Sequence, residues 1–148
     1  MNETARALLV AAALTALGLA VFVQRLVRID PAEPARLIGE LRFSHWMSAT
    51  LAAVSGAWLG LAAASGTQFP GGIDLTVAVL LVVLAAWTLQ RDTRQALTVL
   101  CLAFLGHAII DIAHRPGWLA ADLAPRWFTL GCAAFNLVLS ALCYRVRR

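Results

Sequence analysis

Hydrophobic residues of this chain occur in five long runs, which are separated by short segments rich in arginine, proline or glycine. A hydrocarbon core of about 30 Å is crossed by about 20 helical residues. The pattern therefore predicts an all-α integral membrane protein with five transmembrane helices in a single domain, residues 1–148. The predicted spans lie at about 6–25, 44–64, 73–90, 95–114 and 127–144.

The first run resembles a signal peptide in its position and in its small residues. However, its apolar part, residues 7–23, is longer than the roughly 7–15 residues typical of a signal sequence. The preceding segment MNETAR is also not clearly basic. We therefore expect the first run to be retained as a membrane span.

Arginine placement predicts how the spans are oriented. All 12 basic residues are arginines, and nine of them lie in segments on one side of an alternating five-span arrangement. By the positive-inside rule, that side is cytoplasmic, so the N-terminus is outside and the C-terminus inside. The nine are Arg25, Arg28, Arg36, Arg42, Arg91, Arg94, Arg145, Arg147 and Arg148, against Arg6, Arg115 and Arg126 on the other side.

The segment after the first span contains two prolines, Pro31 and Pro34, and then an amphipathic stretch. Arg36 and Glu40 are spaced i,i+4, as in a helical ion pair. We expect a short, separate helix that lies on the cytoplasmic surface of the membrane. Its apolar side would consist of Leu37, Ile38 and Leu41.

Composition agrees with a membrane location and excludes several other classes. Hydrophobic residues make up 61% of the chain and charged residues 14%, whereas soluble domains average about 25% charged. The use of arginine without lysine, with abundant alanine and leucine, suggests a GC-rich bacterial genome, so we expect the bacterial cytoplasmic membrane. The three cysteines form no CxxC pair. No basic face indicates nucleic-acid binding, and no phosphate loop, HExxH or GxSxG motif occurs.

Three ionisable residues interrupt the apolar fourth run: His107, Asp111 and His114. At about 100° per residue they fall within an arc of roughly 60° on one helix face. The fifth run has a matching polar stripe, and the second has a shorter one. Because polar groups in hydrocarbon turn toward partners or water, we expect these three spans to surround a polar site. The stripes are Thr129, Cys132, Asn136, Ser140 and Cys143 in the fifth run, and His45, Ser48 and Ser55 in the second.

Depth along the helices favours a meeting point near the middle of the membrane. With a rise of about 1.5 Å per residue, His107 lies roughly 18 Å from the cytoplasmic boundary and Asn136 about 14 Å below the outer one. Ser55 reaches roughly 16–17 Å from the inside. Asp111 lies about 6 Å nearer the outer face, and His114 reaches the outer interface.

Two interpretations of this polar face remain. In one, His107 and Asp111 satisfy each other and pin the fourth and fifth spans together, while His114 caps the end of its helix. In the other, they form a functional site, as intramembrane ionisable residues commonly do. The second leads to our main hypothesis, a membrane-embedded enzyme that acts on a lipophilic substrate by proton transfer. His107 and Asp111 would be the acid–base pair, and Asn136 would orient the substrate. We predict no metal and no cofactor for this site.

A different function follows from the sequence LRFSHW at residues 41–46. An R-x-x-H-W pattern at the start of a membrane helix resembles the first helix of bacterial membrane-bound b-type cytochromes. The resemblance covers five residues and implies that His45 is an axial ligand of haem b and that Arg42 lies near a propionate. Such a haem needs a second histidine at the same depth, and His107 and His114 lie deeper or at the opposite face.

A third interpretation is a non-catalytic assembly partner or transport component. Gly56 and Gly60 form a G-x-x-x-G pattern, which permits close helix contact within one chain, in a homo-oligomer or with a partner membrane subunit. Five spans leave little room for the two-fold repeat that is usual in transporters.

Overall fold

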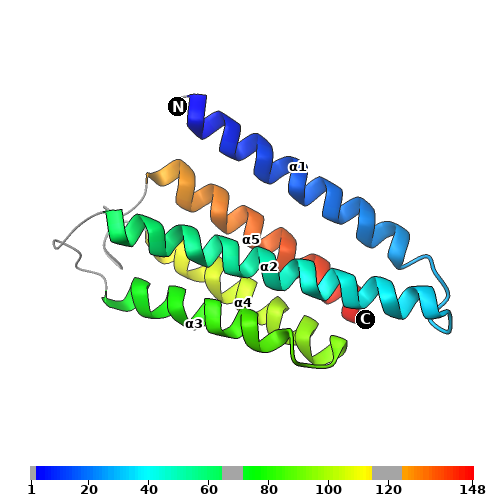
Figure 1. Cartoon of the computed structure of the whole chain (residues 1–148). Coiled ribbons are helices and arrows are strands. Elements are labelled where there is room, and N and C mark those ends of the chain that lie inside the picture. The colour runs from blue at the N-terminus through cyan, green and yellow to red at the C-terminus, as the bar shows by residue number, and fades with distance from the viewer. Residues whose placement is uncertain (1–2, 65–71, 115–124) are drawn as a thin grey trace.

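The computed structural model describes residues 3–64, 72–114 and 125–148, and within these ranges it contains five α-helices and no strand. Figure 1 shows that successive helices run in opposite directions along a single elongated bundle. The all-α fold that the sequence predicts is therefore confirmed. The helices are α1 (Glu3–Leu26), α2 (Pro34–Ala64), α3 (Gly72–Thr88), α4 (Thr93–Ala113) and α5 (Arg126–Arg147).

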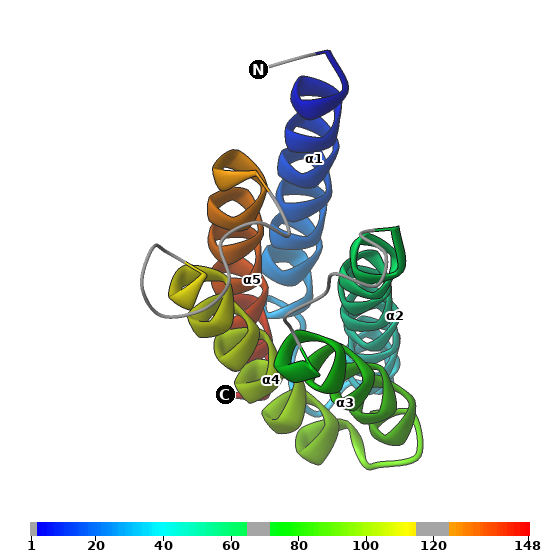
Figure 2. The ribbon, with the colours of Figure 1, turned by 90° about the vertical axis from the view of Figure 1, so that its left-hand side faces the viewer.

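Three of the helices, α1, α4 and α5, are long and apolar enough to cross a membrane, and α3 is a shorter apolar helix. α4 is the central one, because it packs along α5 and also contacts α2 and α3. α1 packs mainly on α5 and stands away from the rest toward its N-terminus (Figure 2). Its exposed Leu8, Leu14 and Leu17 give it the apolar outer surface expected of a helix that faces lipid.

The separate surface helix expected after the first span is not present. Residues 34–64 form one continuous helix of 31 residues. Pro34 is its first residue, where a proline fits because the first turn of a helix needs no backbone N–H donor. No later proline interrupts it, so the amphipathic stretch becomes the first turns of α2.

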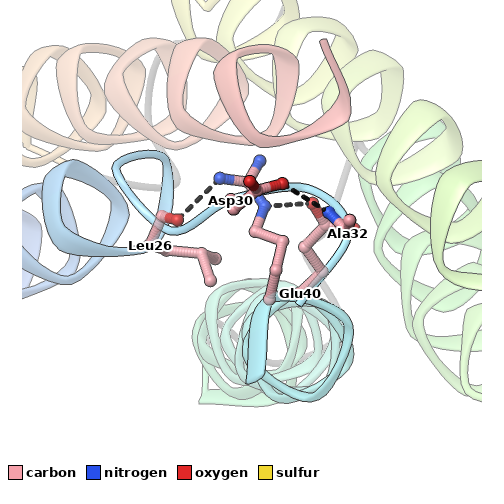
Figure 3. A network of polar contacts seen from close by, with 5 residues as sticks. Leu26, Asp30, Ala32 and Glu40 are labelled. Atoms are coloured by element: carbon pink, nitrogen blue, oxygen red, sulfur yellow. Dashed lines mark hydrogen bonds and ion pairs between the residues drawn. The ribbon is translucent and has the colours of Figure 1, made fainter. Parts of the chain in front are cut away.

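The turn between α1 and α2 is fixed by a buried arginine (Figure 3). The Arg36 Nη1 donates to the carbonyl oxygen of Leu26 at 2.6 Å, and Nε donates to Glu40 at 2.5 Å. The predicted Arg36–Glu40 pair is thus confirmed. Leu26 ends α1, and its carbonyl oxygen accepts both from the guanidinium and from the Ile29 amide at 3.1 Å, in place of a bond within the helix. Asp30 stabilises the turn by accepting from the Ala32 amide at 2.9 Å.

The apolar core fills the half of the bundle where α1 ends and α2 begins. Its largest fully buried side chains come from α2, α4 and α5, and Phe22 of α1 stacks on Phe43 with ring centroids 6.2 Å apart. Two polar contacts cross this half. Ser48 and Thr88 lie 2.8 Å apart, and Ser140 donates to the Cys101 carbonyl at 2.9 Å. The fully buried apolar residues include Phe43, Met47, Leu51, Leu97, Leu100, Phe104 and Leu139.

Candidate functional site

Asp111 and Asn136 meet between α4 and α5 in the interior of the bundle. The Asn136 Nδ2 donates to Asp111 Oδ2 at 3.0 Å. Asp111 is 2% exposed and Asn136 is fully buried. The polar stripes of these two helices thus face each other, and a buried carboxylate is held by an amide.

His107 lies one turn before Asp111 on the same helix face. Its Nε2 is 3.7 Å from Asp111 Oδ1, which is longer than a hydrogen bond. His107 is itself only 4% exposed. The imidazole and the free carboxylate oxygen therefore face each other without a direct bond, at a separation that a small side-chain rotation or one bridging water closes.

A second carboxylate, from Asp74 in the first turn of α3, approaches His114 at the end of α4. The two side chains lie 2.9 Å apart from His114 Nε2 to Asp74 Oδ1, although this contact lacks the alignment of a hydrogen bond. The other ring nitrogen, Nδ1, is 2.8 Å from the Ile110 carbonyl oxygen. His114 is the C-cap of α4, as one interpretation of the sequence expected, but it is also buried against a carboxylate.

Asp74 was not predicted as a site residue. The sequence pattern predicts a polar site among the second, fourth and fifth spans, and the predicted site includes no residue of the third. The available signal was one acidic residue in the first turn of an otherwise apolar helix. Nothing in that segment alone indicates that the residue faces His114, because the contact depends on how α3 packs against α4.

The Trp58 ring of α2 lies close to both His107 and His114. Its ring centroid lies 5.0 Å from that of His114 and 6.4 Å from that of His107. Together with Asp74, these three residues line a small cavity of about 10 Å³, whose wall is completed by Val77, Ala78 and Ile110. A cavity of that volume is about the size needed for one water molecule. His107 and His114 therefore face a common polar space.

Buried polar atoms without a hydrogen bond are concentrated around His107, Asp111 and His114. Seven buried side-chain nitrogen or oxygen atoms have no hydrogen-bond partner among the residues described. Buried polar groups are nearly always hydrogen-bonded, so a cluster of exceptions calls for an explanation such as a bound water or a functional role. The seven are Ser55 Oγ, Trp58 Nε1, Asp74 Oδ1, His107 Nδ1, Asp111 Oδ1, His114 Nε2 and Asn136 Oδ1.

Comparison of the chain with protein-family models, with curated proteins and with solved structures gave no significant match. Conclusions about function therefore depend on the geometry of the chain itself.

An apolar groove of about 260 Å³ lies beside the polar cluster, between α1, α2 and α5. Cys132, one of its lining residues, is one turn before Asn136 on α5. Phe128, another, packs edge-on against Trp58 with ring centroids 5.9 Å apart. The groove and the polar cluster thus share a wall. The remaining lining residues are Leu8, Leu9, Ala12, Ala53, Val54, Ala57, Trp127, Gly131 and Phe135.

His45 and Arg42, the residues of the haem interpretation, are both exposed on α2. His45 precedes Trp58 by 13 positions, or about 20 Å along the helix, and both other histidines lie at Trp58. A haem bound through His45 would therefore need its second histidine from another chain. In the described part of the chain, no group of three or more His, Cys, Asp or Glu side chains is arranged to hold a metal ion.

Gly56 and Gly60 do not mediate contact among the five helices that the structure describes. Both are exposed, and a Cβ atom built at either position meets no heavy atom of the described residues within 4 Å. The expectation of a close contact inside one chain is therefore wrong at these positions. Their face of α2 remains accessible to a neighbouring chain.

Proposed function

We propose that this chain is a small multi-pass enzyme of the bacterial cytoplasmic membrane that performs acid–base chemistry on a lipophilic substrate. Asp111 and His107 exchange the proton, and Asn136 holds the Asp111 carboxylate and orients the substrate. The proposal rests on the different contacts that the two Asp111 carboxylate oxygens make. One oxygen accepts from Asn136 at 3.0 Å, and the other faces an imidazole at 3.7 Å with no partner.

In this geometry the two carboxylate oxygens have different roles. Asn136 fixes the carboxylate through Oδ2, so Oδ1 is free to take a proton from the substrate or to return one. The proton then passes between Oδ1 and the His107 imidazole, which is within reach after a small movement. General acid–base catalysis of this kind contributes about 10²- to 10⁴-fold to a rate.

The neighbouring groove supports a lipophilic substrate. Its lining is almost entirely apolar, and Cys132 lies between it and the Asn136–Asp111 pair along α5. Asp111 is buried and does not line the groove, so a substrate with its hydrocarbon part in the groove meets the carboxylate only when the Cys132 side chain moves aside. Binding sites in proteins commonly combine such an apolar surface with a few convergent polar groups.

Protons reach the site from one end of the bundle. Asp74, His114, Trp58 and the small cavity connect His107 with the end where α4 stops and α5 starts. Toward the opposite end the interior is filled by apolar side chains such as Phe104. A polar path that stops halfway fits a one-sided reaction site better than a channel. With five spans and the nine arginines facing the cytoplasm, this path opens to the outer side.

The experiment is to incubate the purified protein, in proteoliposomes made from total bacterial lipid extract, in D₂O. Mass spectrometry then follows lipids that are converted or that gain carbon-bound deuterium. We expect the wild type to change at least one lipid species, and Asp111→Asn and His107→Gln to lower that rate by about 100-fold or more. Ser140→Ala is the matched control, because it removes a buried polar contact between the same two helices one turn away.

The outcomes separate catalysis from packing. If Asp111→Asn folds and accumulates but retains the wild-type rate, or if the wild type changes no lipid, the catalytic proposal is wrong. If both site variants fail to accumulate while Ser140→Ala accumulates normally, the polar cluster is structural. An absorbance scan after expression with added haem tests the cytochrome alternative, which a Soret band lost in His45→Ala would establish.

The exposed Gly56 and Gly60 favour a second candidate function, assembly with another membrane chain. Small residues at i,i+4 let helix backbones approach closely, and both positions are open to such an approach. Chemical cross-linking in native membranes tests this role with Gly60→Leu. Loss of a cross-linked species in that variant, with retention in Asp111→Ala/His107→Ala, would favour assembly over catalysis.

A further inference from the structure

Two adjoining hollows lie at the end of the bundle where α5 stops, far from the polar cluster. The larger, of about 610 Å³, has apolar walls from α5 and from Val27, which follows the end of α1, together with two arginines. The smaller, of about 160 Å³, is lined almost entirely by arginine. Tyr144 and Arg148 line both, so the two hollows adjoin, and together they are called the pocket below. The larger is lined by Val27, Ala141, Leu142, Tyr144, Arg145 and Arg148, and the smaller by Arg94, Tyr144, Arg147 and Arg148.

The positive charge of this pocket is not neutralised by the protein. Arg94, Arg145, Arg147 and Arg148 form no ion pair with any side chain in the described ranges. The nearest carboxylate along the chain, Asp92, is engaged as the N-cap of α4, where it accepts from the Gln95 amide at 2.9 Å.

Two other arginines at this end of the bundle, Arg36 and Arg91, do have partners. Arg36 is paired with Glu40, and the Arg91 guanidinium lies 4.2 Å from the Trp87 ring centroid. Arg148 likewise lies over the Tyr144 ring, at 5.8 Å from its centroid, but this contact leaves its charge uncompensated. Three arginines without an ion pair line the smaller hollow and two line the larger, with Arg148 common to both, so the adjoining hollows form a site for an anion.

The apolar part of the pocket selects the kind of anion. Val27, Ala141 and Leu142 provide a hydrocarbon surface that continues into the basic part, and a soluble anion such as free phosphate would leave this surface unused. An amphiphile with an acyl chain and a negative headgroup matches both parts. Arginine is well suited to the phosphate, because its planar guanidinium donates two parallel hydrogen bonds.

We propose that this pocket binds one anionic phospholipid, with the phosphate between Arg94, Arg147 and Arg148 and an acyl chain along α5. The pocket lies at the arginine-rich end of the bundle, where lipid headgroups are expected, and basic pockets between membrane helices are typical sites for such lipids. This assignment does not depend on the acid–base chemistry proposed for Asp111.

Native mass spectrometry of the purified full chain tests the proposal with two lipids of identical acyl chains, phosphatidylglycerol and phosphatidylcholine. We expect one phosphatidylglycerol to be retained in preference to phosphatidylcholine. The variant Arg94→Gln/Arg148→Gln should weaken this binding by about 25-fold, since each arginine near an anionic lipid contributes about fivefold. The matched control is Arg28→Gln/Arg42→Gln, which removes the same charge from exposed arginines that line neither hollow, and it should stay within about twofold.

Three further measurements establish whether the ligand is a phospholipid or a phosphate ion. Excess inorganic phosphate should not displace the lipid, and complete displacement would mean that the site binds only the phosphate ion. Ala141→Trp, which fills the apolar part, should weaken phosphatidylglycerol binding even though all four arginines remain. Equal retention of the two lipids, or equal losses in the test and control pairs, would overturn the proposal by reducing the effect to net charge.

Discussion

The hydrogen bond between Asn136 and Asp111 should contribute more to stability than other polar contacts between α4 and α5. Asn136→Ala removes the one side chain that donates to this buried carboxylate among the described residues. Ser140→Ala, one turn later on the same helix, removes a donation to the Cys101 carbonyl at 2.9 Å. Both variants truncate a buried polar side chain at the same interface, so they differ mainly in what is left unpaired.

The expected magnitudes follow from that difference. The Cys101 carbonyl keeps its bond within the α4 backbone, so Ser140→Ala should cost about 0.6 kcal/mol, the usual value for polar contacts between membrane helices. Asp111 loses its donor altogether, and an unpaired buried group costs about 1–3 kcal/mol, more if it is charged. We therefore expect Asn136→Ala to lower the free energy of unfolding by at least about 1 kcal/mol more than Ser140→Ala.

Unfolding in mixed micelles, followed by tryptophan fluorescence as the fraction of denaturing detergent rises, measures these differences. A double-mutant cycle with Asp111→Leu isolates the pair, because Asn136→Ala should lose most of its cost once the carboxylate is gone. Equal costs for Asn136→Ala and Ser140→Ala, or a coupling energy near zero, would refute the claim that Asn136 holds the carboxylate.

Three further predictions test the apolar groove and the turn between α1 and α2. Gly131→Leu, which fills the groove where α1 passes α5, should lower conversion of the lipid substrate in the D₂O assay without loss of folded protein. A lipophilic maleimide should label Cys132, which lines the groove, at least about tenfold faster than the fully buried Cys143, as peptide mass spectrometry can measure. Arg36→Gln should cost about 1–2 kcal/mol of stability, because the side chain loses its bonds to a helix end and to a carboxylate. Arg42→Gln, the control, should change stability by no more than about 0.5 kcal/mol. Unfolding in mixed micelles compares the two variants.

The sequence predicts the helices and the packing of the central pair well. Long apolar runs leave a buried backbone no alternative to helix, so their number and approximate bounds follow directly. The opposed polar stripes of the fourth and fifth runs predict that these helices face each other. Asp111 and Asn136 indeed meet, because each is the most polar deeply placed group on its own helix.

The rest depends on packing that no local pattern contains. Pro31 and Pro34 predict a break, but Pro34 stands at a first helical position, where it starts α2 without interrupting it. The approach of Asp74 to His114 requires the relative position of α3 and α4. Gly56 and Gly60 match a contact pattern, yet both face away from the other described helices.

The two halves of the bundle have different physical roles. One half is a dry core around Phe43, Leu100 and Phe104, whose burial and close packing hold the helices together. The other half carries the seven unpaired polar atoms, an arrangement that lowers stability and that a stable core can tolerate. Under the proposed function, these atoms without hydrogen bonds are the groups that meet the substrate and the proton. Substitutions in the apolar half should therefore change how much protein is folded, while isosteric changes at Asp111 or His107 should change what the folded protein does.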